Sequence, residues 1–419
     1  MSEKLIYKLA FWFFVVLLAI LPFWSAIIAI VTVKSGLDYS QIFWLRVWYE
    51  PVLIILFLFT VFNPIWEKRS LKFKTLDYLA IGYLLWSILS IFVSGETISQ
   101  GVQGLRYNGL FFGFYLLARF CIFTEARSQL LEKIAIYSGR IVALWAVLEV
   151  FIFQPKYWQN LGILPINSTY GYGIAHKVMN VSQAMATMEG PNQLGSFLLL
   201  PLFLSITRNE KKTTTDWLWA AVMILAIILS FSRSAILGLF IGLLVYLIYE
   251  KKISVKIKLS LVGLMIVLFA VSGWYFTRQG GLARDFFTHG ASNQGHYSSM
   301  IDSFTANRST KEWIFGHGIG TAGPASFNFL PTVQESWYLQ VLTELGIVGL
   351  LLWMAIIGAI KIKNLKNNLG YSLSIIGISV AALFLHTWAD NPVLAISFFI
   401  LLGVKYSEKE EESLLRRKS

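Results

Sequence analysis

One glutamate in this chain stands where it could carry out group transfer. Glu335 comes directly before a long apolar run, and a carboxylate there can act as a general base when partial desolvation raises its pKa. A helix cap is the alternative role, because a carboxylate at a helix start accepts hydrogen bonds from free backbone N–H groups. Glu344 lies about two to three turns further along the same run, where a carboxylate is expected to have a partner inside a helix bundle.

Arg233 is the most informative cation. It lies in the hairpin Ser230-Phe231-Ser232-Arg233-Ser234, between two apolar runs long enough to cross a membrane. An arginine there either snorkels to the surface or meets an anion, and guanidinium is the preferred fork for phosphate. Further cations map to the same side of the membrane: Arg106, Arg278, Arg284, Arg308 and Lys311. Their convergence favours an anionic ligand at the membrane face.

Neutral and acidic polar residues accompany these cations. Gly190-Pro191-Asn192-Gln193-Leu194-Gly195 is typical of a helix start, and Asn192 and Gln193 would also face the same outer cavity as Arg233. Arg140 and Glu149 are expected to pair with polar neighbours in the bundle, and Asp390 is a minor candidate for orienting an arginine.

The motifs of metal and cofactor enzymes are missing from the sequence. There is no phosphate loop, no His-Glu-x-x-His pattern, and no Asp-x-Asp pair on the outer side. His289, His296 and His317 lack the spacing of a zinc site, and the single Cys121 excludes an internal disulfide. We therefore predict no metal and no cofactor.

The elements that must position these residues are membrane helices. With 56% hydrophobic residues, 14% charged residues and a mean hydropathy of +0.63, the chain is predicted to be an all-α integral membrane protein. About twelve apolar runs are long enough to span a bilayer. They cover residues 9–33, 42–63, 75–94, 107–124, 131–153, 191–207, 215–231, 234–249, 254–276, 336–360, 370–386 and 392–406.

Lysine and arginine gather in every second gap between these runs. Cytoplasmic loops carry this excess, so both termini are predicted to be cytoplasmic, and the net charge of +12 is explained without nucleic acid. The first run is too long for a signal-peptide core and is expected to be a retained helix. Residues 1–419 form one polytopic domain, with outer loops at 154–190 and 277–335 and a charged cytoplasmic tail at 407–419. The second loop is expected to contain a helix at 297–305 and a glycine-rich turn at 316–320.

Four motifs, in this order, resemble the O-antigen ligase and polymerase superfamily. They are Gly-Pro-Asn-Gln-Leu-Gly at 190–195, Ser-Phe-Ser-Arg-Ser-Ala at 230–235, Phe-Gly-His-Gly-Ile-Gly at 315–320, and Glu-Ser-Trp-Tyr-Leu-Gln at 335–340 followed by Glu-Leu-Gly-Ile-Val-Gly at 344–349. The resemblance covers roughly residues 183–350. It implies a C-type membrane glycosyltransferase that takes glycans from a polyprenyl diphosphate carrier at the outer face of the cytoplasmic (inner) membrane.

The resemblance also implies roles for particular residues. Arg233 corresponds to a diphosphate ligand and Glu335 to the catalytic position, while Gln183 and Tyr338 join Asn192 and Gln193 as further substrate contacts. Two departures stand out. Ligases usually have histidine and asparagine where this chain has Glu335 and Ser336, and many relatives have an arginine at the position of Gln183.

Our hypothesis is an inverting, metal-independent transfer. Arg233, helped by Arg106 and by Arg308 or Arg284, would hold the donor diphosphate while Glu335 takes the proton of an acceptor hydroxyl. The acceptor is a lipid, a glycan or a protein. A polysaccharide polymerase of the same superfamily is the first alternative. A twelve-span transporter and a non-catalytic protein that binds carrier lipid are the others.

Overall fold

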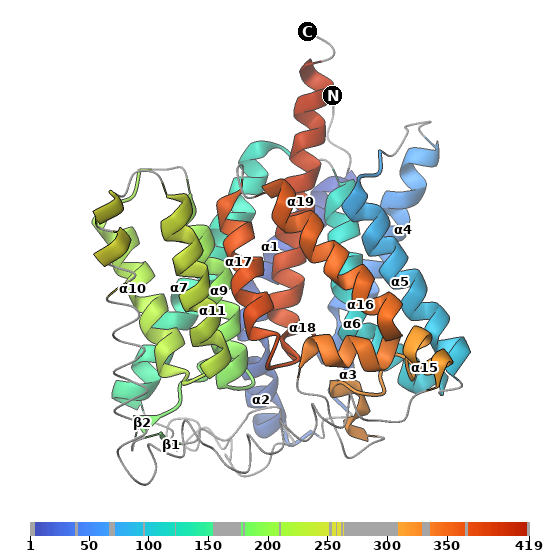
Figure 1. Cartoon of the computed structure of the whole chain (residues 1–419), viewed down its shortest axis with the longest axis horizontal. Helices are drawn as coiled ribbons and strands as arrows, with labels where there is room; N and C mark the ends of the chain where they lie inside the picture. Colours follow the sequence, from blue (N-terminus) through green and yellow to red (C-terminus); the bar gives the residue numbers. More distant parts are fainter. Residues whose placement is uncertain are drawn as a thin grey trace.

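A computed structural model gives the fold of the chain, and it describes residues 5–37, 41–66, 72–94, 97–121, 123–153, 177–178, 181–208, 211–250, 254–256, 258–260, 263, 309–328, 336–364 and 368–416. These residues are almost entirely helical (Figure 1).

The N-terminal third of the chain forms helices α1 to α7. Their bounds are α1 Leu5–Ile20, η1 Leu21–Phe23, α2 Trp24–Ser35, α3 Phe43–Val47, α4 Tyr49–Trp66, α5 Thr75–Ser94, α6 Ile98–Phe120 and α7 Glu125–Leu148, which η2 Glu149–Phe153 continues. The first three elements follow one another without a break, as one apolar stretch of 31 residues. This confirms a first helix that runs well past the length of a signal-peptide core.

A short hairpin and a second set of helices follow. The bounds are β1 Lys177–Val178, β2 Val181–Ser182, α9 Pro191–Thr207, α10 Thr214–Leu229, α11 Arg233–Tyr249, α15 Thr310–Phe315, η4 Pro324–Asn328, α16 Trp337–Asn364, α17 Leu369–Ala381, α18 Thr387–Asp390 and α19 Pro392–Arg416. β1 and β2 pair antiparallel.

Four described helical stretches are long and apolar enough to cross a membrane, namely Leu5–Ser35, Thr75–Ser94, Glu125–Phe153 and Trp337–Ile360. Five shorter apolar helices accompany them. The chain is therefore a helical membrane protein. The runs predicted at 75–94 and 191–207 coincide with α5 and α9. Most of the run at 254–276, and the helix expected at 297–305, lie outside the described residues.

α6 differs from the apolar run predicted at 107–124. It begins earlier, at Ile98, because the Thr97 side chain accepts a hydrogen bond from the backbone of Gln100 and caps the helix. α6 is also not one of the described helical stretches that are apolar enough to cross a membrane. It carries the buried polar residues Gln100, Asn108 and Arg119. α6 can hold them because α4, α5 and α19 pack around it, so these side chains meet protein rather than lipid.

Two close helix contacts lie within the core. α6 packs along α19, with Phe111 and Phe399 stacked at a ring-centroid distance of 4.8 Å. α11 packs along α17 and α9, and a Cβ placed on Gly238 would lie 2.3 Å from the carbonyl oxygen of Gly377. Small residues at such a contact let two backbones approach closely, which is how helices associate inside a membrane.

The two chain termini lie on the same side of the bundle, while α3, α15, β1 and β2 lie toward the opposite side (Figure 1). We call this opposite side the distal end. The predicted topology places both termini in the cytoplasm and therefore the distal end outside.

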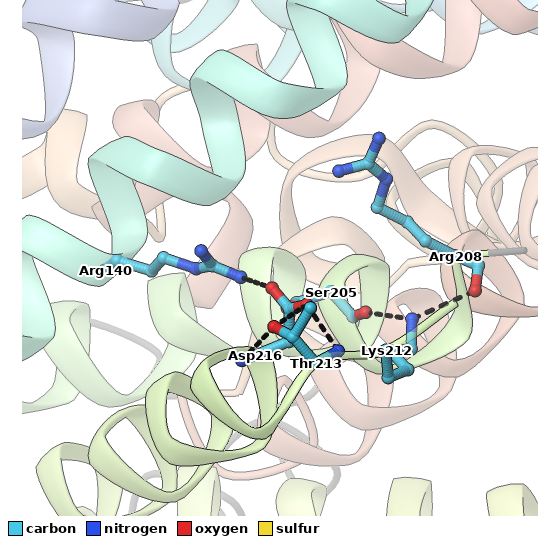
Figure 2. A network of polar contacts seen from close by, with 6 residues as sticks. All are labelled: Arg140, Ser205, Arg208, Lys212, Thr213 and Asp216. Carbon is cyan, nitrogen blue, oxygen red and sulfur yellow. Dashed lines mark hydrogen bonds and ion pairs between the residues drawn. The ribbon is translucent and has the colours of Figure 1, made fainter. Parts of the chain in front are cut away.

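Away from the distal end, α7 and α10 are joined by an ion pair. Arg140 Nη2 lies 2.7 Å from Asp216 Oδ1, and Asp216 also forms a capping box with Thr213 at the start of α10 (Figure 2). Lys212 Nζ donates to the carbonyl oxygens of Ser205 and Arg208 at 2.6 and 2.9 Å, which closes the end of α9 (Figure 2). The expectation that Arg140 pairs within the bundle is confirmed.

Candidate functional site

The Arg233 hairpin is held against the first turns of α9. The Ser230 hydroxyl donates to Ile227 O at 2.6 Å and accepts from Ser232 N at 3.2 Å, which tightens the link between α10 and α11. A Cβ placed on Gly195 would lie 2.7 Å from Ala235 Cβ and 2.9 Å from Ser230 Oγ. The half-buried Arg233 therefore begins α11 beside the start of α9.

Asn192 and Gln193 lie in the first turn of α9, one turn before Gly195. Asn192 is exposed. Gln193 is tied to the link between α18 and α19, because its Nε2 donates to Asp390 and its backbone oxygen accepts from Asn391 Nδ2 at 2.8 Å. Asp390 therefore orients the side-chain amide of Gln193, whereas the sequence suggested an arginine as its partner.

Gln183 is brought to the same region by the segment that follows β2. Its neighbour Ala184 donates from N to Leu229 O at 2.9 Å, which places the segment at the C-terminal end of α10, close to the Arg233 hairpin. The Glu149 carboxylate also holds this segment, because it accepts hydrogen bonds from Met185 N at 3.1 Å and from Ala186 N at 2.7 Å. This confirms that Glu149 has polar partners inside the protein.

Arg106 and Tyr338 have their polar groups engaged within the protein. Arg106 Nε lies 2.9 Å from Glu50 Oε2, and Arg106 Nη2 lies 2.6 Å from Glu50 Oε1, so the guanidinium is balanced by a carboxylate. The Tyr338 hydroxyl donates to Ser379 O on α17 at 3.2 Å. These contacts engage Nε and Nη2 of Arg106 and the hydroxyl proton of Tyr338.

Glu335, Arg284 and Arg308 lie outside the described residues. The nearest described backbone to Glu335 is the start of α16. Trp337 N there lies 3.1 Å from both Ala382 O and Leu385 O, in the link from α17 to α18. α17 packs along α11, the helix that Arg233 begins.

Glu189, Asp390 and Arg46 come from distant parts of the chain and form a charged cluster that the sequence did not predict. Glu189 is exposed and accepts from Ser25 Oγ at 3.3 Å. Although solvent reaches the Glu189 side chain, desolvation by the protein around its carboxyl group, and then the charge of Asp390, raise its pKa above the ordinary value of 4.5, against the opposing effect of Arg46. The only signal in the sequence was that Glu189 directly precedes the Gly190-Pro191 helix start.

The glycine-rich turn at 316–320 is confirmed. Gly316, Gly318 and Gly320 all have positive φ, of 75°, 106° and 92°. Glu344 is fully buried beside it and accepts a hydrogen bond from Asn108, as expected for a carboxylate paired inside the bundle.

Within the described residues, no group of three or more His, Cys, Asp or Glu side chains is placed to hold a metal ion. His317 lies 3.6 Å from the carboxylate of Glu312, and His289 and His296 fall outside the described residues.

These features define a polytopic helical membrane protein with arginine, amide and carboxylate side chains gathered toward its distal end. The O-antigen ligase family profile matches residues 218–354, which include most of α10, all of α11, α15 and η4, and most of α16. The chain therefore carries a domain of the O-antigen ligase family, a family of glycosyltransferase-like enzymes that act in general on lipid-linked glycans. The match confirms the resemblance for the motifs at 230–235, 315–320 and 335–349, whereas the motif at 190–195 lies before it. A search of curated proteins gave no significant match to the chain.

Proposed function

We propose that the protein transfers an oligosaccharide or polysaccharide from a polyprenyl diphosphate carrier to an acceptor hydroxyl at the outer face of the cytoplasmic membrane. The observation that carries the proposal is the position of Arg233. Within an O-antigen ligase domain, it begins a helix beside the polar start of α9.

The start of α11 offers an anion more than one kind of contact. The Ser232 side chain stands at the N-cap position of this helix and makes no capping hydrogen bond. A helix N-terminus binds phosphate through its backbone N–H groups and through its dipole. Together with the Arg233 guanidinium, this favours Arg233 and the α11 start as the diphosphate site.

Glu335 is the proposed general base. Its carboxylate takes the proton of the acceptor hydroxyl while the hydroxyl oxygen forms a bond to the anomeric carbon of the donor glycan. The bond from that carbon to the diphosphate oxygen breaks, and its electron pair leaves with the diphosphate. The displacement inverts the anomeric carbon. Arg233 stabilises the charge on the leaving group, with Arg308 or Arg284 as helpers.

The participation of Arg106 is limited by its ion pair. Nε and Nη2 of its guanidinium are engaged by Glu50, so these two nitrogens would hold a diphosphate only by exchanging that carboxylate for phosphate oxygens. In the arrangement described, Arg106 acts by joining α4 to α6. We therefore rank it below Arg233 as a donor ligand.

Three charged groups within the apolar runs are the features that would support the transporter alternative. Arg140 pairs with Asp216, Glu149 with the backbone of residues 185 and 186, and Glu344 with Asn108 and backbone N–H groups. Each therefore has a structural partner, and no described contact favours transport. A surface-polysaccharide polymerase differs from a ligase only in its acceptor, and the Glu335-Ser336 pair in place of His-Asn keeps this alternative within the proposal.

The test is transfer by the purified full-length protein in lipid nanodiscs with a polyprenyl-diphosphate-linked oligosaccharide. We expect Arg233→Gln to lower the turnover roughly 10²–10³-fold, and Arg233→Lys to recover part of it because the charge remains without the fork. Lys211→Gln, an exposed cation in the link between α9 and α10, is the matched control and should leave turnover unchanged. Equal turnover of Arg233→Gln and the wild type would refute the diphosphate role. Binding of donor without any product would favour the carrier-lipid-binding alternative.

A further inference from the structure

Glu344 is a fully buried carboxylate whose hydrogen-bond donors come from other elements. Its Oε1 accepts from Ala322 N at 3.0 Å and from Gly323 N at 2.9 Å, and its Oε2 accepts from Asn108 Nδ2 on α6. One side chain of α16 therefore ties the segment 316–323, which we call the docked turn, to α6.

α16 contributes its backbone to the same contact because the helix is broken at Gly346, where φ is 65°. A break of this kind releases carbonyl groups that would otherwise accept hydrogen bonds within the helix. His317 N donates to Thr343 O at 2.8 Å, and Gly318 N donates to Glu344 O at 3.0 Å. The docked turn thus occupies the hydrogen-bonding positions that the break exposes.

α5 and α6 hold the other side of the docked turn. Ile319 N donates to the Ser90 hydroxyl at 3.3 Å, and Gln100 Nε2 donates to Gly320 O at 3.2 Å. A Cβ placed on Gly104 would lie 2.4 Å from Gly320 N, so this contact has no room for a larger residue. The docked turn is therefore enclosed by α5, α6 and α16.

The amide of Asn108 extends the contact to a second residue of α16. Gln340 Nε2 donates to Asn108 Oδ1 at 2.9 Å, while Asn108 Nδ2 donates to Glu344. The donors run in one direction, from Gln340 to Asn108 and from Asn108 to the carboxylate of Glu344. A glutamine at position 344 would place an NH₂ group against another donor unless the neighbouring amides turned over.

We propose that Glu344 is a positioning residue for glycan transfer. By docking residues 316–323 on α6 and α16, its carboxylate fixes α15 and η4, the described parts of the outer loop on either side of the turn, in the positions that transfer needs. In sequence, Arg284 and Arg308 precede the docked turn and Glu335 follows it. The inference rests on the proposed function, and it assigns Glu344 no contact with the substrate.

The test exchanges the two partners of one hydrogen bond. Glu344→Gln leaves two donors facing each other, and Asn108→Asp brings two buried carboxylates together. The double variant Asn108→Asp with Glu344→Gln restores every bond. The oxygen of the new amide would accept from residues 322 and 323, and its NH₂ would donate to the new carboxylate on α6, which would still accept from Gln340. Glu125→Gln, an exposed glutamate of α7 outside this contact, is the matched control.

Two readouts are needed for each variant. Amide hydrogen exchange at residues 317, 318, 322 and 323 reports the docking directly, and we expect Glu344→Gln to speed it at least about tenfold. Transfer of carrier-linked glycan should fall at least about tenfold in kcat, with a smaller change in the KM for donor. The double variant should regain most of both, and the control should change neither.

Slow exchange retained in Glu344→Gln would overturn the docking role. Faster exchange with unchanged kcat would overturn the positioning role, as would a double variant that regains neither readout. If the wild type transfers no glycan, the proposed function fails, and with it the positioning role, while the exchange readout still decides whether Glu344 docks the turn.

Discussion

Arg106 and Glu50 form a bidentate ion pair that joins α6 to α4. Two guanidinium nitrogens approach the carboxylate at distances of 2.6 to 3.0 Å, and the Arg106 and Glu50 side chains are 34% and 16% exposed. Arg106, a cation on the predicted outer side, is therefore explained by its pairing with Glu50 inside the protein, without an anionic ligand. The outer cations of this protein must accordingly be assessed one at a time.

Glu50→Gln should destabilise the protein modestly, because Arg106 would lose its ionic partner while it remains half-buried. We expect a loss of about 1 kcal/mol in the free energy of unfolding, seen as a lower midpoint in thermal unfolding of the nanodisc-embedded protein. If transfer increases in this variant, the released guanidinium contributes to donor binding. An unchanged midpoint would show that the pair adds nothing to stability.

Glu335→Gln should abolish measurable transfer, because the amide cannot take the acceptor proton. A positioned base contributes roughly 10²–10⁴-fold to the rate, so turnover should fall by that factor while binding of the diphosphate carrier is retained. Turnover is followed as released polyprenyl diphosphate, with Glu125→Gln as the control. Wild-type turnover in Glu335→Gln would leave the residue with only the capping role.

Asp216→Ala should lower stability without affecting the chemistry. The change removes both the ion pair with Arg140 and the capping box with Thr213, which together are worth about 1–3 kcal/mol. Arg140→Gln removes the ion pair and leaves the capping box in place, so the difference between its unfolding midpoint and that of Asp216→Ala measures the cap. α10 is 16 residues long, which separates this contact from the Arg233 hairpin by about 24 Å. Transfer per folded molecule should therefore match the wild type.

Glu189 should make the stability of the protein depend modestly on pH, because solvent reaches its side chain and screens part of the effect. Its pKa of about 7 in the folded protein lies above the ordinary value of 4.5, so the folded state favours the protonated carboxyl. The stabilisation is complete below pH 4.5 and is lost as the pH rises through 7. Glu189→Gln removes this dependence. Compared with the wild type, the variant should gain in unfolding midpoint between pH 5 and pH 8, and a constant difference across that range would contradict the shifted pKa.

The predicted orientation can be tested by cysteine labelling at the two ends of α9. In a Cys121→Ser background, Asn192→Cys should react with a membrane-impermeant maleimide added to intact cells. Lys211→Cys should react only after the membrane is permeabilised. α9 is 17 residues long, or about 25 Å, so its two ends lie near opposite membrane surfaces. The reverse pattern would turn the proposed site toward the cytoplasm.

Hydropathy and charge in the sequence determined which segments are helices. A bilayer leaves an unpaired backbone no partner, so an apolar run of about 20 residues has to become a helix, and the runs at 75–94 and 191–207 did so without change. The sequence also determined that Arg140, Glu149 and Glu344 would have partners, since an isolated charge inside the bundle is costly.

The identity of those partners was decided by the tertiary structure alone. Helix packing brings Asp216 to Arg140, the backbone of residues 185 and 186 to Glu149, and Asn108 to Glu344. No local pattern in the sequence encodes these contacts, because the paired residues lie tens to hundreds of positions apart. The same reason explains why Glu189 and Asp390, about 200 residues apart in the chain, form one charged cluster only in the folded protein.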